Sequence, residues 1–333
     1  MYTQTKKATV PPVSLFVLKW QNWRKSEKLP HYCLASVKHA VPSLPPYAID
    51  MWPLLALPFG TLDEEGVPTY DAQGYSAKFH PTVIAQYALA HWNAYIATGD
   101  HKHREAFMIQ ANWLSAHESR LSDDRGGWPM PFLSYRYNAL NPWLSALTQG
   151  NCISVLVRAY RLTGEEVFLQ VARRAVRTFE LDIKEGGVSS SVGENGIFFE
   201  EVAVCPPAHI LNGHILALFG LCDYVALTDD PSISELIQRS LVTLDTLIDE
   251  FDTGYWSYYD LRFKSLAPRF YHALHITLLQ ALARYPGCEH CAARAEHWAR
   301  YQQSFLCRLR YLITVLADHA YRVLRTSKHK VEG

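Results

Sequence analysis

The chain has no excess of charge of either sign. Among its 333 residues, 32 Lys and Arg side chains balance 32 Asp and Glu side chains, so the formal net charge at pH 7 is zero. A protein that binds DNA or RNA through a broad surface needs a surplus of cations to neutralise phosphates. The missing surplus argues against a nucleic-acid partner.

The sequence also lacks a long uninterrupted hydrophobic run. A membrane helix needs roughly 18 to 20 consecutive apolar residues, and the apolar stretch 210–221 contains Asn212 and His214. No small-residue cleavage site follows the short apolar patch at 13–18. We therefore expect no membrane insertion and a cytoplasmic location.

Cysteine is sparse, with seven irregularly spaced residues. An odd, scattered set is typical of reduced core cysteines rather than of a disulfide-stabilised fold. Cys288 and Cys291 form one CxxC motif close to His290 and His297, but the second cysteine pair of many structural zinc sites is missing. We interpret the motif as two partly buried thiols and expect no metal.

Aromatic residues, in contrast, are abundant. The chain has 9 Trp, 19 Tyr and 14 Phe within a composition that is 49% hydrophobic, which is sufficient for a folded protein with an ample core. These rings exceed what a helical core needs, and they can stack on ligands or donate hydrogen bonds. We therefore expect part of them to line a ligand cleft.

A repeat of 65 residues organises the chain, because turns reading IATGD, RLTGEE and ALTDD place threonines at positions 98, 163 and 228. A stretch with helical apolar periodicity precedes each turn and another follows it, most clearly at 167–181. A fourth pair is indicated after position 275. Hairpins of this length predict a mainly α fold, an α/α toroid or incomplete α/α barrel, with a plain helical array as the alternative.

The loops after the second helices of a toroid emerge at the same end. Three such loops, at 123–132, 185–202 and 252–263, are rich in glycine and aromatic residues. We expect them to carry short β-hairpins and to form one mouth that holds the active site. The rings expected to line this mouth are Trp128, Phe198, Phe199, Tyr255, Trp256, Tyr258, Tyr259 and Tyr271.

Three segments are predicted along the chain. Residues 1–77 are rich in proline and show little helical periodicity, which indicates an irregular N-terminal arm packed on the toroid. Residues 78–325 are expected to form the toroid, and residues 326–333 a polar C-terminal tail.

Polar and aromatic residues gather in the second and third mouth loops and in the helices that follow them. The set comprises Glu200, Glu201, His209, Asn212, His214, Tyr258, Tyr259, Asp260, Arg262, Tyr271, His272 and His275. An arginine that binds a carboxylate, together with aromatic faces and acidic groups, suits an anionic sugar. Each residue also has an ordinary structural interpretation, such as a solvated glutamate pair, a local Asp260–Arg262 ion pair, or a core side chain.

The motifs at these positions resemble those of the D-glucuronyl C5-epimerases, in the C-terminal region of enzymes that act on heparosan and heparan sulfate precursors. The matching strings, in the order of the family, are GVPTYDAQGY, IAQYALAH, GGWP, SALTQGNCISVLVRAYRLT, FFEEV, ILNG, YDLR and YHALHI. The resemblance implies an α/α-barrel domain, no organic cofactor, and inversion of D-glucuronate to L-iduronate within an acidic polysaccharide or oligosaccharide.

Inversion at C5 requires removal of a proton α to a carboxylate and return of a proton to the opposite face. Two acid/base groups are needed, and a cation is most useful where charge develops on the substrate carboxylate. The resemblance implies that Glu201 and Tyr271 exchange the proton, while Tyr259 and Arg262 hold or polarise the uronate. Further substrate contacts are predicted from Tyr75, His80, Gln86, Trp128, Glu200, Asn212, Tyr258, His272 and His275. The sequence is also compatible with a homodimer.

Two departures from the family pattern leave alternatives open. The family has a tyrosine after the paired glutamates, where this chain has Val202. Animal members also carry a large β-rich region before the GGWP loop, whereas here one predicted helix leads directly into the next. A different uronan, a shorter oligosaccharide or an inactive glycan-binding relative remain alternatives, as do a polysaccharide lyase and a glycoside hydrolase that uses Glu201 and Asp260.

Overall fold

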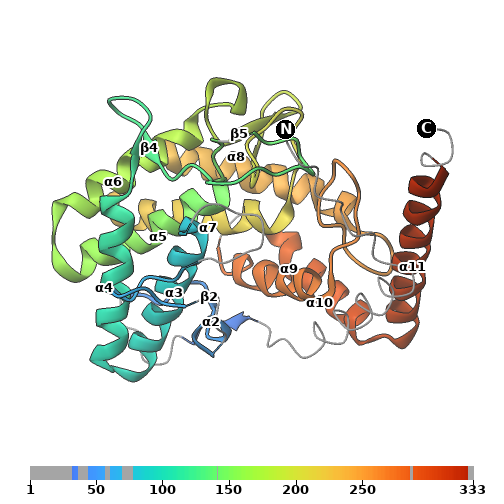
Figure 1. The fold of residues 1–333 in the computed structure, drawn as a ribbon, viewed down its shortest axis with the longest axis horizontal. Helices are drawn as coiled ribbons and strands as arrows, with labels where there is room; N and C mark the ends of the chain where they lie inside the picture. The colour runs from blue at the N-terminus through green and yellow to red at the C-terminus, as the bar shows by residue number, and fades with distance from the viewer. Residues whose placement is uncertain are drawn as a thin grey trace, which may run out of the picture.

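Pairs of helices joined by short turns make up most of the structure (Figure 1). The computed structural model describes residues 32–36, 44–56, 61–69, 78–140, 142–285 and 288–328. The first three pairs are α3 (Pro81–Thr98) with α4 (His101–Ala116), α5 (Ala146–Thr163) with α6 (Glu166–Val176), and α7 (Leu211–Thr228) with α8 (Pro231–Leu247). The first helix of each pair ends at a threonine of the 65-residue repeat, and the predicted mainly α fold of repeated hairpins is confirmed.

The turn sequences explain why one helix ends and the next begins. Gly99 and Gly164 have left-handed φ angles of 71° and 75° after α3 and α5, a conformation that glycine adopts without a steric penalty. Asp100 and Asp230 then precede α4 and α8, and their carboxylates accept hydrogen bonds from backbone N–H groups of the first turn. The TGD and TDD strings therefore combine a helix end with a helix start.

The fourth pair consists of α9 (Arg269–Leu282) and α10 (Glu289–Gln303), and α11 (Phe305–Lys328) follows it. Ser304 separates the last two helices, because its backbone is extended with φ −69° and ψ 124°. α11 stands at one edge of the molecule (Figure 1), where the ring of Tyr311 stacks on that of Trp256 with their centroids 4.6 Å apart.

The helix pairs form two rows. α3, α5, α7 and α9 contact one another in that order, while α4, α6, α8 and α10 each pack behind their partner. The antiparallel ribbon of β1 (Cys33–Leu34) and β2 (Ile49–Asp50) contacts both α3 and α9, the two ends of the first row. The short helix α2 (Pro53–Ala56) packs on α3. The described parts of the N-terminal arm therefore lie between the ends of an incomplete toroid.

Helices α5 and α7 cross at a contact that only small residues permit. A Cβ at Gly220 of α7 would lie 2.2 Å from the carbonyl oxygen of Gly150, and a Cβ at Gly150 of α5 would lie 2.6 Å from the Cα of Ala217. Of the described helices, α7 alone has the length and apolar composition of a membrane span. Most of it is buried, because it packs against α5, α8 and α9.

Gly220→Ala is expected to lower the free energy of unfolding by about 1–3 kcal/mol, because the added methyl group forces two helix backbones apart. Urea or guanidinium unfolding would measure the change. The matched control is Gln238→Ala on the exposed face of α8, where the expected change is within about 0.5 kcal/mol. An unchanged stability of the glycine variant would contradict the close packing of α5 and α7.

A buried charge network also connects α5, α7 and the N-terminal arm. The guanidinium of Arg158 in α5 is paired with Asp223 in α7, with Nη2–Oδ1 at 3.1 Å, and it donates to the carbonyl of Pro46 at 3.1 Å. Ser154 Oγ donates to the same aspartate at 2.7 Å. Because Arg158 is almost fully buried, this network holds the arm against the inner helices.

The expected short β-hairpins are present at the first two mouth loops, whereas the third, which is described in full, has only isolated bridges such as Asp252 with Ser257. β3 (Ser119–Arg120) pairs with β4 (Gly126–Gly127), and β5 (Ser189–Val192) pairs with β6 (Gly196–Phe199), both antiparallel. Three 3-10 helices accompany them, η1 (Arg177–Glu180), η2 (Ile183–Glu185) and η3 (Ile248–Phe251). The hairpins fix the loop ends, so the residues after β6 have a defined place next to the start of α7.

The prediction that the surplus rings line the mouth is wrong for five of the eight. These five are at most 8% exposed and pack in core clusters: Trp128, Phe198, Phe199, Tyr255 and Trp256. The mouth loops are packed hairpins whose apolar sides cover the helix ends, which buries these rings. Tyr258, Tyr259 and Tyr271 remain partly exposed.

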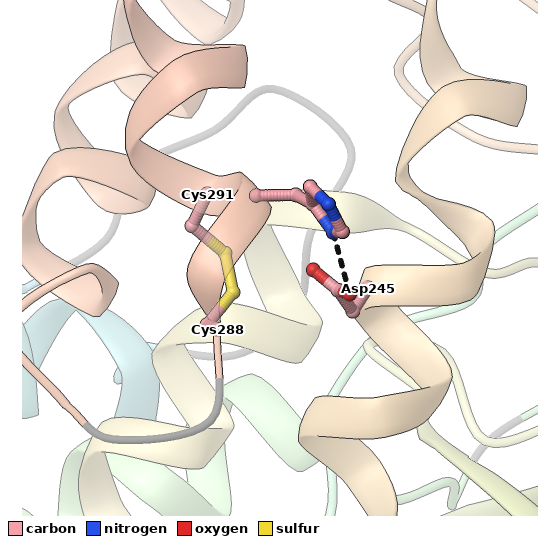
Figure 2. Close-up of a disulfide and its surroundings, with 4 residues drawn as sticks. Asp245, Cys288 and Cys291 are labelled. Atoms are coloured by element: carbon pink, nitrogen blue, oxygen red, sulfur yellow. Dashed lines mark hydrogen bonds and ion pairs between the residues drawn. A yellow bond between two sulfur atoms is a disulfide. The ribbon is translucent and has the colours of Figure 1, made fainter.

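The prediction of seven reduced core cysteines is wrong for four of them. Cys288 and Cys291 are joined by a disulfide at the start of α10, beside the hydrogen bond between Nδ1 of His290 and Oδ2 of Asp245 at 2.7 Å (Figure 2). Cys33 and Cys205 are free thiols but exposed. Within the described ranges, no three His, Cys, Asp or Glu side chains lie close enough together to hold a metal ion.

Candidate active site

Glu201 lies just after β6, where the second mouth loop meets the start of α7. Its Oε2 accepts a hydrogen bond of 2.8 Å from Nδ2 of Asn212, in the first turn of α7. Its Oε1 accepts one of 3.2 Å from the hydroxyl of Tyr259 in the third mouth loop. The fold therefore brings three of the predicted site residues into direct contact.

α7 has room for this carboxylate because residue 213 is glycine. A Cβ at Gly213 would lie 2.4 Å from Cβ and 2.6 Å from Oε2 of Glu201. The adjacent Asn212 supplies the amide that holds the same Oε2. Two successive positions of the ILNG string thus provide the space and the donor for the Glu201 side chain.

The environment of Glu201 favours a protonated carboxyl group more than water does. Burial raises the pKa of Glu201 from 4.5 to about 7, and the neighbouring Glu200 adds to the increase. The hydrogen bonds from Tyr259 and Asn212 oppose this rise in pKa because they stabilise the charged form. At neutral pH both forms are present, so the group can accept or donate a proton.

Two tyrosines from different elements meet beside this carboxylate. The ring of Tyr271, in the first turn of α9, meets the ring of Tyr259 edge-on, with 4.9 Å between the centroids and 73° between the planes. Burial and the neighbouring Glu201 raise the pKa of Tyr259 well above 10. The Tyr259 hydroxyl is therefore a proton donor at neutral pH.

Glu200 faces the interior rather than the mouth. It is fully buried, and it accepts hydrogen bonds of 2.6 Å from Ser190 Oγ and of 3.1 and 3.0 Å from the backbone N–H groups of Ala208 and His209. Nδ1 of His209 lies 2.7 Å from Oε1, the oxygen that also accepts from Ser190, while the backbone N–H groups donate to Oε2. These contacts close the loop between β6 and α7, so Glu200 holds the segment that carries the neighbouring site glutamate.

Arg262 forms its side-chain hydrogen bond with the second mouth loop. Its Nη1 donates to the carbonyl of Pro206 at 2.9 Å, and its guanidinium lies over the ring of Phe263, 5.0 Å from the centroid. Glu201 instead receives its hydrogen bonds from Asn212 and Tyr259. The role of Arg262 at the substrate carboxylate stays a prediction.

Sequence reasoning missed two residues near this site, Arg136 and Tyr137. Nη2 of Arg136 donates to Oδ2 of Asp260 at 2.9 Å, and the hydroxyl of Tyr137 donates to the same oxygen at 3.4 Å. Asp260 is fully buried, and its Oδ1 accepts from the backbone N–H of Phe263 at 2.6 Å. The segment around Tyr137 has no helical periodicity. The alternation of tyrosine and arginine at 135–137 was the one feature that could have marked it as part of a site.

The two predicted site histidines of α9 belong to the core. His272 and His275 are fully buried, and their Nδ1 atoms lie 2.8 and 3.1 Å from the shared hydroxyl of Ser257. Burial lowers the pKa of His272 to about 3. Both rings are therefore neutral at physiological pH and are held away from the Glu201 carboxylate by their packing around Ser257.

The other predicted substrate contacts are placed as follows. Trp128 is 2% exposed and donates through Nε1 to the carbonyl of Leu114 at 2.9 Å. His80 precedes α3 and packs against the ring of Phe132 at 5.1 Å between centroids, and burial lowers its pKa to about 4. Gln86 and Tyr258 are partly exposed, whereas Tyr75 lies outside the described residues.

A cleft of about 520 Å³ opens beside the second mouth loop. This volume is in the range of small-ligand sites. It is lined on one side by the loop after β4 and on the other by residues that follow Glu201 and η2, including Pro129, Trp143, Leu144, Gly187, Ala203 and Val204. Glu201, Asn212, Tyr259 and Tyr271 are not among its lining residues, although Ala203 and Val204 follow Glu201 by two and three positions.

Comparisons with known proteins identify the family of the chain. A family model described as the D-glucuronyl C5-epimerase C-terminus matches residues 122–300. The chain belongs to this family. The D-glucuronyl C5-epimerase of Caenorhabditis elegans is 33% identical over 222 residues, which cover 60% of this chain and 35% of the relative. An uncharacterized protein of Methanocaldococcus jannaschii is 31% identical over 136 residues, or 40% of this chain and 44% of that protein.

The chain therefore spans less than half the length of both relatives. Among solved structures, a family 76 glycoside hydrolase from a bovine Bacteroides thetaiotaomicron strain superposes with a TM-score of 0.45 and 13% identity. The alignment covers 66% of this chain and 47% of that chain.

Val202, which stands where the epimerase family has a tyrosine, is part of a packed cluster. It is 4% exposed and shares the cluster with Tyr137, Trp143 and Ile210, while Tyr259 borders it. Val202→Tyr is expected to lower the free energy of unfolding by about 1–3 kcal/mol, because the larger ring has to displace packed neighbours. Chemical denaturation measures the change in the free energy of unfolding. Val202→Ile adds a smaller group at the same position and serves as the comparison.

Proposed function

We propose that the protein inverts C5 of D-glucuronate to give L-iduronate in a heparosan-like polysaccharide, without a cofactor. The observation that carries the proposal is the contact of Glu201 with Tyr259, beside Tyr271. It combines a carboxyl group whose pKa is about 7 with two phenols. Membership of the C5-epimerase family supports the same reaction class.

The proposed chemistry uses these groups in sequence. One member of the Glu201–Tyr271 pair removes the C5 proton, and the electron pair of the broken C–H bond moves onto the uronate carboxylate as an enediolate. The other member then protonates C5 from the opposite face. Tyr259 donates a hydrogen bond throughout, because its pKa is raised and its hydroxyl stays protonated.

The interior position of Asp260 argues against a glycoside hydrolase at the same site. A hydrolase needs two carboxyl groups that reach the scissile bond. Asp260 is fully buried, and its two oxygens are engaged by Arg136, Tyr137 and the backbone of Phe263. The second carboxyl group of the Glu201–Asp260 pair is thus unavailable to a substrate.

Isotope exchange tests the proposal directly. The protein is incubated in D₂O with heparosan and with several other uronans, and NMR then follows deuterium at C5 and the appearance of iduronate. We expect both signals with at least one glucuronate polymer. No incorporation with any uronan would reject the proposed function.

Two further measurements separate the alternatives. A lyase would produce an unsaturated uronate that absorbs in the ultraviolet, whereas an epimerase makes none. Glu201→Gln and Tyr271→Phe should strongly lower the rate of exchange but keep uronan binding if both residues handle the proton. A glycan-binding relative without activity would show unchanged binding in Tyr271→Phe and no exchange in the wild type.

A further inference from the structure

We propose that Arg136 and Tyr137 bind the carboxylate of the uronate substrate in the candidate active site. This inference rests on the proposed function and assigns its substrate-recognition element. Both residues lie on the loop between β4 and α5, residues 130–143, which we call the 130–143 loop. None of the sequence motifs drew attention to this loop.

The described residues of the 130–143 loop, 130–140 and 142–143, form a small hairpin that extends toward the third mouth loop. The backbone N–H of Met130 donates to the carbonyl of Trp143 at 2.8 Å. Ser134 and Ala139 each donate to the carbonyl of the other, both at 3.0 Å. Asn138 at its tip has a left-handed φ of 55°, which permits the tight reversal. The loop thus presents Arg136 and Tyr137 from a backbone that is fixed at both ends.

The third mouth loop holds the guanidinium in place. Nη2 of Arg136 is bound by Oδ2 of the buried Asp260 at 2.9 Å and by Oγ of Ser265 at 2.5 Å. The guanidinium also lies 5.4 and 5.2 Å from the ring centroids of Tyr137 and Phe263. Cation and rings therefore hold one another in a defined geometry.

A ligand can reach the guanidinium. The Arg136 side chain is 43% exposed, its bonds to Asp260 and Ser265 both use Nη2, and Tyr137 is a further hydrogen-bonding neighbour of the guanidinium. A half-exposed cation that is anchored in this way can bind a carboxylate with little loss of side-chain entropy. Arg262 differs, because its Nη1 is bound to the Pro206 carbonyl.

This pair also lies close to the acid/base residues. Asp260, which both Arg136 and Tyr137 contact, directly follows Tyr259 in the chain, and the hydroxyl of Tyr259 bonds to Glu201. Tyr137 and Tyr259 also pack in one apolar cluster with Val202. A uronate whose C5 lies at Glu201 can therefore place its carboxylate toward the 130–143 loop.

Tyr137 has the protonation state that carboxylate binding requires. Burial and the neighbouring Asp260 raise its pKa well above 10, and the negative charge of Glu201 contributes to the increase. The hydroxyl is therefore a donor at any physiological pH. Tyr137 is only 5% exposed, and its present bond to Asp260, at 3.4 Å, is long enough to be exchanged for a bond to a ligand that reaches the hydroxyl.

The test compares Arg136→Lys and Tyr137→Phe with Arg262→Lys, at the arginine that the family resemblance assigns to the uronate, and with the matched control Arg239→Lys on the exposed face of α8. Each protein is assayed for binding and C5 exchange with heparosan oligosaccharides, and for binding of the same oligosaccharides after reduction of their carboxyl groups. Lysine keeps a positive charge beside Asp260 but loses the planar fork, and phenylalanine removes only a hydroxyl. Thermal unfolding confirms that each variant is folded.

We expect Arg136→Lys to lower kcat/KM for exchange by about 10²-fold, the order of effect for a lost charge-stabilising donor. Tyr137→Phe should lower it by about tenfold, as expected for one hydrogen bond to a charged group. Both variants should lose most of the preference for native over carboxyl-reduced oligosaccharides. A residue that acts only on stability would leave this ratio unchanged.

Retention of the carboxylate preference in both variants would overturn the inference, and so would its loss in Arg262→Lys alone. If Arg136→Lys fails to fold, the result for Tyr137→Phe decides. A wild-type protein without exchange on any uronan would reject the proposed function instead, so the two failures are distinguishable.

Discussion

Replacing Glu201 with glutamine is expected to lower the rate of C5 exchange by about 10²- to 10⁴-fold, the usual contribution of a general acid or base. Glutamine keeps the size of the side chain and can still contact Asn212 and Tyr259, but it cannot carry the proton. NMR detection of deuterium at C5 measures the loss. The matched control is Glu194→Gln at the exposed turn between β5 and β6, for which we expect wild-type exchange.

The pH dependence of exchange should identify the part that Glu201 plays. Its pKa is about 7. In the direction in which Glu201 removes the proton, the rate should fall as the pH drops below about 7, because the carboxylate form is lost. In the reverse direction, where Glu201 donates, the rate should fall above that pH. A wild-type profile with no inflection between pH 6 and 8 in either direction would contradict the assignment.

Glu201→Gln should lower the rate of exchange but raise the free energy of unfolding above pH 7. Because folding raises the pKa of Glu201 from 4.5 to about 7, the stability linked to its proton is fully present below 4.5 and is lost as the pH rises through 7. Glu201→Gln removes this dependence. The variant should therefore be more stable than the wild type above pH 7, although it is less active. Denaturation at pH 5 and pH 8 would measure the difference.

The helical architecture could be predicted because its signals are local. Thr98, Thr163 and Thr228 lie at helix ends that glycine or aspartate terminates, and these short strings are visible without any tertiary information. Burial of the mouth rings could not be predicted in this way. Whether Trp128 or Trp256 faces a ligand or the core depends on how a loop folds back on the helix ends.

The candidate site was predictable only in part, for a similar reason. Glu201, Asn212 and Tyr259 were found because each belongs to a motif, and the fold places them in contact. Arg136 approaches from a loop far away in the sequence and meets Asp260 across 124 positions. Only the packed structure shows such a pairing, and it also shows Arg262 bound to a neighbouring carbonyl.

Asp223→Asn is expected to lower the free energy of unfolding by about 3–5 kcal/mol, the usual cost of removing one partner of a buried ion pair. The side chain of Arg158 is only 2% exposed, so its charge cannot turn to water once the carboxylate is gone. Urea unfolding measures the loss. The matched control is Glu180→Gln, which removes a surface pair with Arg177 and should cost less than about 1 kcal/mol.

The double variant Arg158→Met/Asp223→Leu tests the reason for this loss. If the cost of Asp223→Asn comes from an uncompensated buried charge, removing both charges should restore most of the stability. If the pair instead holds the N-terminal arm, the double variant should stay unstable, because the bond from Arg158 to the Pro46 carbonyl is also lost. Proteolysis near Pro46 would then increase. Equal stability of Asp223→Asn and the wild type would contradict a buried pair.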